Sequence, residues 1–179
     1  MSAVACTEEL LKIGQSFDIT IFGDEPYTNY DRALLPSVLA GERDFDSIVL
    51  NDIEWYQEHG IRTRLGIRVE EIDRVARAVR SSDGDWSTYD KLILATGSTP
   101  IVPPADGLDK AGVFFFGTLD DTRGIIDAAS KGKRAVVMGG WLAADVGHGL
   151  RKRGCDVTVA EIEAVLGDGR VEAVRFTNG

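Results

Sequence analysis

The chain has 179 residues, of which 44% are hydrophobic and 27% are charged, a composition typical of a soluble globular protein with one domain or two small ones. Its 29 acidic residues outnumber its 20 basic residues and give a net charge of -9, which argues against nucleic acid as a partner, because phosphate contacts need clustered cations. No apolar run reaches the roughly 20 residues that span a bilayer, the N-terminus lacks the basic segment of a signal peptide, and the spacing of Cys6 and Cys155 fits neither a disulfide framework nor a structural metal site. We therefore expect a cytoplasmic protein that binds neither nucleic acid nor membranes.

The first elements are a short helix and a strand. Thr7 is predicted to act as an N-cap or first-turn residue of a helix over residues 8–12. Residues 17–22, F-D-I-T-I-F, alternate and are rich in β-branched side chains, which predicts a strand. Residues 27–41 are predicted to form a loop that leads into a short broken helix, because Pro36 cannot lie deep inside a regular one.

A second group of elements ends in an apolar run. Asn51 or Asp52 is expected to cap a helix over residues 53–59 that Gly60 ends. Trp55 and Tyr56 on this helix are interpreted as core residues. Short strands are predicted over residues 61–65, 69–72 and 78–80, with a turn at 82–85, and residues 92–94 are predicted to form a buried strand.

The residues after this buried strand are unusually small. The strand runs into Ala95-Thr96-Gly97, and a strand needs no such ending unless something must lie close to the backbone there. Three prolines follow, at positions 100, 103 and 104, and indicate a linker with a boundary near residues 108–112. We therefore predict two domains, residues 1–108 and 109–179.

The second half alternates strands and helices. Residues 113–116 precede a helix around 119–130, then come a strand at 135–138, a helix at 142–153 and a strand at 157–160. This β-α-β order predicts a parallel sheet with a right-handed crossover. Residues 162–166 and 171–176, joined by Gly167-Asp168-Gly169, are predicted to form a hairpin. The fold class is thus α/β.

One segment of the second half resembles a dinucleotide site. Gly139-Gly140 lies between the predicted strand and helix, where a glycine turn lets a pyrophosphate approach the helix N-terminus. Glu161 lies about 20 residues further on, in the position of an acid that binds a ribose. However, Trp141 occupies the place of the middle glycine of the fingerprint, while Ala144 is acceptable at the last place. Two interpretations remain open, a working site and a Rossmann-shaped unit kept for packing with Trp141 filling the vacancy.

The first half carries a similar but incomplete pattern. Glu25 follows the strand at 17–22 as a ribose-binding acid would. The helix before that strand begins almost at Met1, so the strand and glycine turn that precede such a helix in a dinucleotide fold are missing. Either upstream residues were lost or the domain is built without them. In both cases we expect an unpaired sheet edge beside residues 19–21, which favours self-association.

Three runs of sequence carry a family resemblance: E-P-Y-T-N-Y-D-R-A-L-L-P-S-V-L-A-G-E, W-Y-Q-E-H-G-I and Y-D-K-L-I-L-A-T-G-S-T-P. They resemble the N-terminal flavoprotein region of the large subunit of assimilatory nitrite reductases, within the pyridine nucleotide–disulfide oxidoreductase superfamily. The resemblance implies two incomplete Rossmann-like domains for FAD and NAD(P)H, with parallel sheets and small antiparallel inserts. We nominate no catalytic side chain, because a bound flavin would do the chemistry, and no metal ligand, because His148 has no companion ligand at i+4 or i−4. The FAD-binding residues that the resemblance implies are Glu25, Asn29, Arg32, Ser37, Ala95, Thr96 and Gly97, and the NAD(P)H-binding residues are Gly139, Gly140 and Glu161.

The resemblance also defines where the chain departs from its family. Several tens of residues are missing between Ala160 and Glu161, and the acidic flavin-closing motif, the siroheme parts and the interface domain are missing after Gly179. We therefore interpret the chain as a truncated member. Two interpretations of Arg32 are equally good: it contacts a phosphate from its polar loop, or it is a solvated surface residue.

Three functions follow from these observations. The first is an FAD-dependent NAD(P)H oxidoreductase module that passes hydride to FAD and electrons to a downstream domain or subunit. The second is an inactive remnant that serves only as a folded or protein-binding scaffold. The third is a single-nucleotide or small-ligand binding module that uses only Gly139-Gly140. The electron acceptor, the choice between NADH and NADPH, the oligomeric state and the completeness of the chain stay open.

Overall fold

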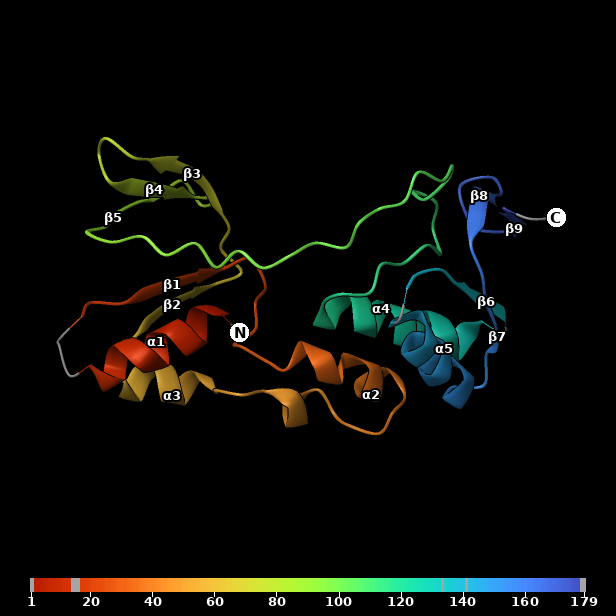
Figure 1. Ribbon diagram of the computed structural model, residues 1–179, viewed down its shortest axis with the longest axis horizontal. Helices are drawn as coiled ribbons and strands as arrows, with labels where there is room; N and C mark the ends of the chain where they lie inside the picture. The colour runs from red at the N-terminus through yellow and green to blue at the C-terminus, as the bar shows by residue number, and fades with distance from the viewer. Residues whose placement is uncertain (1, 14–16, 133, 141, 178–179) are drawn as a thin grey trace. The chain divides into compact units, whose positions relative to one another are not determined.

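The computed structural model describes residues 2–13, 17–132, 134–140 and 142–177 (Figure 1). The chain divides into two compact units. Unit 1 consists of Met1–Asp31 and Val49–Ser98, and unit 2 consists of Arg32–Ile48 and Thr99–Gly179. Residues 32–48 thus fold with the C-terminal part of the chain. The predicted domains, residues 1–108 and 109–179, stay a prediction. Each unit is described separately below.

Unit 1 contains a small parallel sheet with helices on one side (Figure 1). Strands β1 and β2 pair in parallel, with Thr20 opposite Arg62 and Gly23 opposite Leu65. The core under this sheet contains Val4, Tyr56 and Ile61, against which partly buried side chains from β1 and both helices pack. The elements are α1 (Ser2–Lys12), β1 (Thr20–Gly23), α3 (Ile53–Glu58) and β2 (Arg62–Leu65).

The local chemistry of α3 explains its bounds. The Asp52 carboxylate accepts a hydrogen bond of 2.9 Å from the backbone N–H of Trp55, which satisfies one of the donors left open in the first turn of a helix. Gly60 follows the helix with a φ of +65°, a conformation that glycine adopts without steric cost. The predicted cap, helix and stop signal are confirmed. Tyr56 is 3% exposed, so its predicted place in the core is confirmed as well.

An antiparallel sheet completes unit 1. Its order is β3-β4-β5, and a register shift lies between Val69 and Glu71. Two of the strands match the predicted ones closely, whereas β5 was not predicted. Their bounds are β3 (Val69–Asp73), β4 (Ala78–Ser81) and β5 (Trp86–Thr88).

Two predictions for unit 1 are wrong. Thr7 does not cap a helix, because α1 already begins at Ser2 and the Thr7 hydroxyl donates to the carbonyl of Ala3 within it. Residues 92–94 form no strand, and their exposed fractions are 39% for Leu92, 55% for Ile93 and 68% for Leu94. An apolar run becomes a buried strand only beside a hydrogen-bonding neighbour, and the described residues of unit 1 provide none for this run.

Unit 2 is built around a β-α-β unit. Strands β6 and β7 pair in parallel, with Arg134 opposite Asp156 and Val137 opposite Val159. Helix α5 connects them and packs on both, as the alternation predicts. The Thr118 hydroxyl and the Asp121 carboxylate form a capping box at the start of α4, which explains why that helix begins at Leu119. The elements are α4 (Leu119–Lys131), β6 (Arg134–Val137), α5 (Leu142–Lys152) and β7 (Asp156–Val159).

Residues 32–48 pack on the helices of this unit. They contain η1 (Arg32–Leu34), α2 (Leu35–Leu39) and η2 (Asp46–Ile48), and α2 contacts both α4 and α5. Pro36 lies in the first turn of α2, where its missing N–H costs nothing. Arg153 donates to the carbonyls of Leu39 and Val38, so it satisfies the Leu39 acceptor left open at the end of that helix. The core under these helices contains Leu39, Ile125, Ala129, Val137, Ala143, Val146, Leu150, Cys155 and Val157.

A hairpin follows the parallel strands. Strands β8 (Ile162–Leu166) and β9 (Ala173–Phe176) pair antiparallel, with Ile162 opposite Phe176, so the predicted hairpin is confirmed. Isolated bridges join Asp106 to Ala164 and Ala111 to Arg170, which anchors the proline-rich segment to this hairpin. Among the described residues no helix is long and apolar enough to cross a membrane, and no group of three or more His, Cys, Asp or Glu side chains could hold a metal ion.

Candidate nucleotide-binding site

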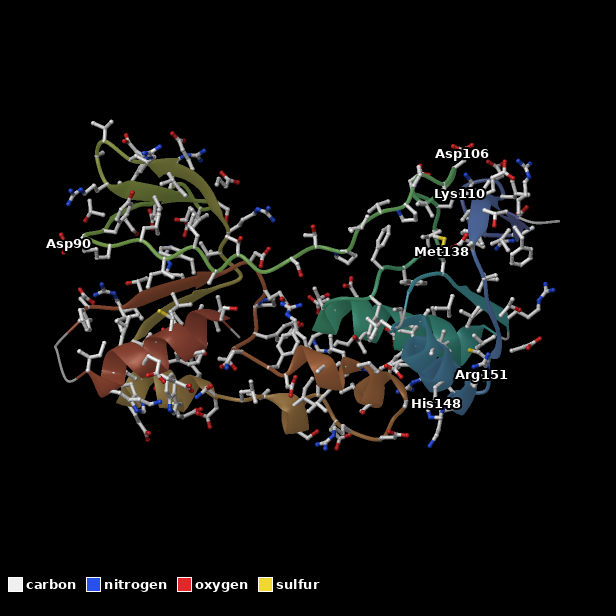
Figure 2. All side chains as sticks on the ribbon, viewed as in Figure 1. Asp90, Asp106, Lys110, Met138, His148 and Arg151 are labelled. Atoms are coloured by element: carbon white, nitrogen blue, oxygen red, sulfur yellow. The ribbon has the colours of Figure 1, made fainter. Side chains whose placement is uncertain are left out.

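Two of the predicted residues, Gly139 and Glu161, lie just beyond the carboxyl ends of the neighbouring strands β6 and β7. Val137 and Val159 are register partners, and the N–H of Ala160 donates to the carbonyl of Val137 at 3.1 Å. Gly139 and Glu161 each lie two residues beyond this pair. Because parallel neighbours run about 4.8 Å apart, the glycine turn and the acid lie at one edge of the sheet. Figure 2 labels Met138, which is the residue between β6 and the turn.

The glycine turn leaves open space at the start of α5. Gly139 has a φ of +152°, and a methyl group added at Gly140 would meet no described atom within 4 Å apart from its chain neighbours. Helix α5 then begins at Leu142, and its first N–H groups, together with the helix dipole, favour an anion there. Trp141 lies outside the described residues, so its predicted filling of this space stays a prediction.

A surface pocket lies at the end of β7. Its volume is about 480 Å³, and it is lined by Thr158, Ala160, Glu161, Phe176 and Thr177. The carboxylate of Glu161 is the one charged group among these lining residues. The N–H of Thr177 donates to the carbonyl of Glu161 at 3.4 Å, so the hairpin holds one wall of the pocket beside the acid.

Two of these lining residues were not singled out in the sequence. Phe176 and Thr177 follow Glu161 by more than a dozen positions, and only the pairing of the hairpin brings them back to it. The available signal was the hairpin register. Once Ile162 begins β8, the residues opposite the start of that strand lie at the end of β9, next to the acid.

The described residues of unit 2 fit the adenosine and pyrophosphate portion of a dinucleotide. Gly140 leaves the space that a phosphate needs, α5 offers donors to it, and Glu161 borders a pocket on the same edge. In dinucleotide folds an acid in this position accepts hydrogen bonds from a ribose. The geometry therefore supports the predicted grouping of Gly139, Gly140 and Glu161, whose role as ligand contacts stays a prediction.

In unit 1, the predicted ribose-binding acid is Glu25. It follows the end of β1, and its carbonyl accepts a hydrogen bond from the N–H of Gly66 after β2. Its carboxylate accepts a hydrogen bond of 2.5 Å from the Tyr30 hydroxyl. A ribose would therefore have to share this carboxylate with Tyr30.

Asn29 belongs to a polar network inside the same unit. Its side-chain amide N–H group donates to Asn51 at 2.9 Å, and its side-chain oxygen accepts from the hydroxyl of Tyr56 at 2.7 Å. Burial raises the pKa of Tyr56 above its ordinary value of 10.0, while a hydrogen bond with Asn29 acts in the opposite direction. These contacts give Asn29 a structural role that accounts for it without a ligand.

The next two predicted residues lie in unit 2. Arg32 donates to the carbonyl of Gly117 at 2.5 Å, just before the capping box of α4. Ser37 lies in α2 and lines a second pocket of about 500 Å³ with Glu42, Arg43, Asp44 and Ser47. Of the predicted flavin residues, Glu25, Asn29 and residues 95–97 thus belong to unit 1, whereas Arg32 and Ser37 belong to unit 2.

Residues 95–97 are exposed and form no helix or strand. Gly97 has a φ of +71°, and a methyl group added to it would meet no described atom within 4 Å apart from its chain neighbours. Unit 1 thus contains the acid and the small-residue turn of the predicted FAD site, and their role as ligand contacts stays a prediction.

A match to a family model shows which protein family the chain belongs to. The model of the pyridine nucleotide-disulphide oxidoreductases matches residues 1–173. The chain belongs to this family. Members and structural neighbours of the family are FAD- and NAD(P)H-binding oxidoreductases, and the mixed α/β fold with parallel and antiparallel sheets agrees with the predicted fold class.

Two of the curated relatives are named for the reduction of nitrate or nitrite. The chain is 42% identical over 161 residues to the assimilatory nitrate reductase electron transfer subunit of Bacillus subtilis, which covers 89% of this chain and 21% of that protein. It is 38% identical to the nitrite reductase [NAD(P)H] of the same organism, which covers 100% of this chain and 27% of that protein. The chain thus spans about a quarter of the length of these oxidoreductases, and the predicted resemblance to nitrite reductase is confirmed.

The alignment with the nitrite reductase [NAD(P)H] also contains a gap. It extends over 215 positions, whereas the chain has 179 residues, a difference of 36. Segments of the relative therefore have no counterpart in this chain, as expected for a truncated member. The predicted location of the missing segment, between Ala160 and Glu161, stays a prediction.

Solved structures of the family have the same fold. The chain resembles the water-forming NADH oxidase of Lactobacillus brevis bound to NADH with a TM-score of 0.73 and 25% identity, which covers 80% of this chain and 33% of that one. The agreement therefore extends over most of this chain but over only a third of its structural neighbour.

Proposed function

We propose that this chain is the NAD(P)H-binding portion of an NAD(P)H-dependent oxidoreductase of the nitrite reductase type. The observation that carries the proposal is the placement of Gly139-Gly140, the start of α5 and Glu161 at one edge of the β6–β7 sheet. A relative that is 38% identical is named nitrite reductase [NAD(P)H], and a structural neighbour is bound to NADH. Both support a pyridine nucleotide as the ligand.

Each part of this edge has a distinct role in the proposal. The absence of a side chain at Gly140 makes room for a phosphate, and the N–H groups of the first turn of α5 donate to it. The carboxylate of Glu161 accepts hydrogen bonds from the ribose hydroxyls. When bound, the nicotinamide supplies hydride chemistry, and the protein supplies position and orientation.

The proposal assigns FAD to the complete oxidoreductase and a downstream domain or subunit as the electron acceptor. The relative from B. subtilis is named an electron transfer subunit, which supports an acceptor outside this chain. No function is assigned to unit 1 alone. The predicted transfer of hydride to FAD within this chain stays a prediction.

Two properties of the whole chain belong to the same proposal. We infer a cytoplasmic location, because Cys6 and Cys155 are both free thiols and disulfides are rare in that compartment. We also infer self-association through unit 1, because β1 and β2 form a sheet of only two strands and unpaired strand edges recruit other chains. Sedimentation at several protein concentrations tests the second inference, and a sedimentation coefficient independent of concentration that corresponds to a monomer contradicts it.

The variant Gly140→Ala tests the ligand site without disturbing the fold. Its methyl group meets no described atom apart from its chain neighbours, so the melting temperature is expected to stay within about 2 °C of that of the wild type. The same methyl group enters the phosphate space, and we expect calorimetric titration to show NADH binding weakened about ten-fold or more.

Gly147→Ala is the matched control in the same helix. Its methyl group would pack at 3.4 Å from Val159, on the side of α5 that faces the sheet, and NADH affinity is expected to be unchanged. The proposal fails if the folded wild-type chain shows no saturable NADH binding, or if Gly140→Ala binds NADH as tightly as the wild type.

A scaffold without a ligand is the second candidate function. It is favoured by Glu25 and Asn29, whose side chains make hydrogen bonds inside unit 1, and by the exposed apolar run at 92–94. The titration separates the two candidates, because a scaffold folds cooperatively and binds no NADH.

A further inference from the structure

The β8–β9 hairpin contributes two of the five residues that line the pocket at the end of β7, Phe176 and Thr177. Phe176 is the last residue of β9 and lies opposite Ile162, the residue after Glu161. The hydrogen bond from the Thr177 N–H to the Glu161 carbonyl joins the two strands at the same point. The hairpin therefore brings Phe176 to the pocket that Glu161, the predicted ribose-binding acid, also lines.

Phe176 is not placed as a core residue of its hairpin. The hairpin is anchored by Ala164 and Val165, which are 3% and 5% exposed, whereas 40% of the Phe176 side chain is exposed. The 40% of its surface that stays exposed contributes nothing to the hydrophobic stabilisation of the fold. The exposed ring instead provides a flat apolar surface at the pocket.

The chemistry of the pocket divides into a polar and an apolar part. Glu161, Thr158 and Thr177 present a carboxylate and two hydroxyl groups, which suit the hydroxyls of a sugar. Phe176 and Ala160 are apolar, and a purine base is a flat aromatic ring that stacks on such a side chain. A nucleoside has the same division into sugar and base.

Resting on the proposed function, we propose that Phe176 is the platform on which the adenine base of the bound nucleotide stacks. Glu161 holds the ribose, and the hairpin thereby becomes part of the nucleotide site. The site takes adenine nucleotides such as AMP, ADP-ribose and NADH. Nicotinamide mononucleotide lacks adenine, so its binding gains nothing from the Phe176 ring.

Titrations with AMP, ADP-ribose and nicotinamide mononucleotide, followed by NMR up to millimolar ligand, test this assignment. In Phe176→Leu the flat ring is replaced by an aliphatic group, and we expect the affinity for AMP and ADP-ribose to fall about ten-fold, within the range of measured base stacking. Phe176→Tyr keeps a ring and is expected to retain the wild-type affinity. The affinity for nicotinamide mononucleotide is expected to be the same in all variants.

Phe115→Leu is the matched control, because Phe115 is 38% exposed, belongs to the same unit and does not line the pocket. It is expected to leave AMP binding unchanged. A further result expected from stacking is a ring-current shift of the adenine H2 and H8 signals that is lost in Phe176→Leu.

The outcomes separate this inference from the proposed function. If the wild type binds AMP and ADP-ribose and Phe176→Leu binds them equally well, the stacking role is wrong and the proposed function stands. A Phe176→Leu variant that only melts at a lower temperature, with unchanged affinity, assigns the ring to packing and also contradicts the inference. A folded wild type that binds none of the three ligands contradicts the proposed function itself.

Discussion

Glu161 is the one charged residue among those that line the pocket at the end of β7. A carboxylate there accepts hydrogen bonds from the free 2′-hydroxyl of NADH but repels the 2′-phosphate of NADPH. The residues that line this pocket include no arginine or lysine to offset the repulsion. The side chain at this position thus distinguishes the two nucleotides in our proposal.

We expect the wild type to bind NADH at least about ten-fold more tightly than NADPH. Glu161→Gln removes the charge and keeps the size, so NADH binding weakens by roughly ten-fold or more, as hydrogen bonds to charged groups contribute about 1.5–3 kcal/mol. The ratio of the affinity for NADH to the affinity for NADPH also falls, because the repulsion of the 2′-phosphate is lost. Calorimetric titration with both nucleotides at one ionic strength measures the ratio of the two affinities in the wild type and in Glu161→Gln. Equal affinities for NADH and NADPH in the wild type would contradict the proposed role of Glu161.

Asn29 illustrates a residue whose family role and structural role differ. The resemblance assigns it to FAD, but its side chain bridges Tyr56 and Asn51 inside unit 1. Asn29→Ala leaves both partners without this hydrogen bond, so we expect the free energy of unfolding to fall by about 1–3 kcal/mol. Urea unfolding of Asn29→Ala measures this loss, and a change below about 0.5 kcal/mol shows that the network is not structural.

Tyr56→Phe provides a second readout of the network through its pH dependence. The folded-state pKa of Tyr56 is raised by burial, so its contribution to stability is fully present below the unfolded pKa of about 10 and is lost as the pH rises through the folded value. The wild type is therefore expected to lose stability more steeply than Tyr56→Phe above about pH 10.

At the scale of elements, helix α5 packs against α2 through a glycine. A methyl group added at Gly149 would lie 2.9 Å from the Leu39 side chain and 3.2 Å from the Ala40 nitrogen. The second contact involves backbone, which cannot move aside easily. The same change at Gly147 gives only an ordinary contact of 3.4 Å with Val159.

We predict opposite effects for the two substitutions. Gly149→Ala is expected to destabilise the protein by about 1–2 kcal/mol, because the cost of overpacking exceeds the gain in helix propensity. Gly147→Ala is expected to be neutral or to stabilise by up to about 1 kcal/mol. Thermal unfolding of the two variants side by side measures the difference, and equal melting temperatures would show that α2 and α5 do not pack at Gly149.

The elements that could be predicted from the sequence are those defined by local chemistry. The Asp52 cap and Gly60 define α3, and the alternation around Gly139-Gly140 defines β6, α5 and β7. Residues 92–94 were wrongly predicted as a buried strand, because L-I-L specifies burial only if a sheet neighbour is present. The pocket wall at Phe176 was not foreseen, since it depends on which residues of a hairpin lie opposite one another.

At the scale of the whole molecule, the two units differ in what they supply. Unit 2 has a glycine turn, a helix start and an acid at one sheet edge, whereas two of the predicted flavin residues of unit 1, Glu25 and Asn29, make hydrogen bonds inside that unit. The shared family with FAD- and NAD(P)H-binding oxidoreductases does not remove this difference. The chain is thus expected to distinguish between the two cofactors.

A polypeptide of these 179 residues is expected to bind NADH without retaining FAD. After incubation with excess FAD and gel filtration, its visible spectrum should lack the flavin absorption bands, because the side chains of Glu25 and Asn29 already make hydrogen bonds inside unit 1. A yellow protein with about one FAD per chain would show that residues 95–97 and Glu25 suffice for binding. It would also make the predicted transfer of hydride from NADH to FAD open to direct measurement.

The most direct test of the site in unit 2 is a titration of ¹⁵N-labelled protein with ADP-ribose. We predict saturable shifts that concentrate on the backbone amides of Gly139, Gly140, Glu161 and Thr177, with little change at Asn29 and Gly97. Amide signals that do not move up to millimolar ADP-ribose, or shifts centred on unit 1, would contradict the account.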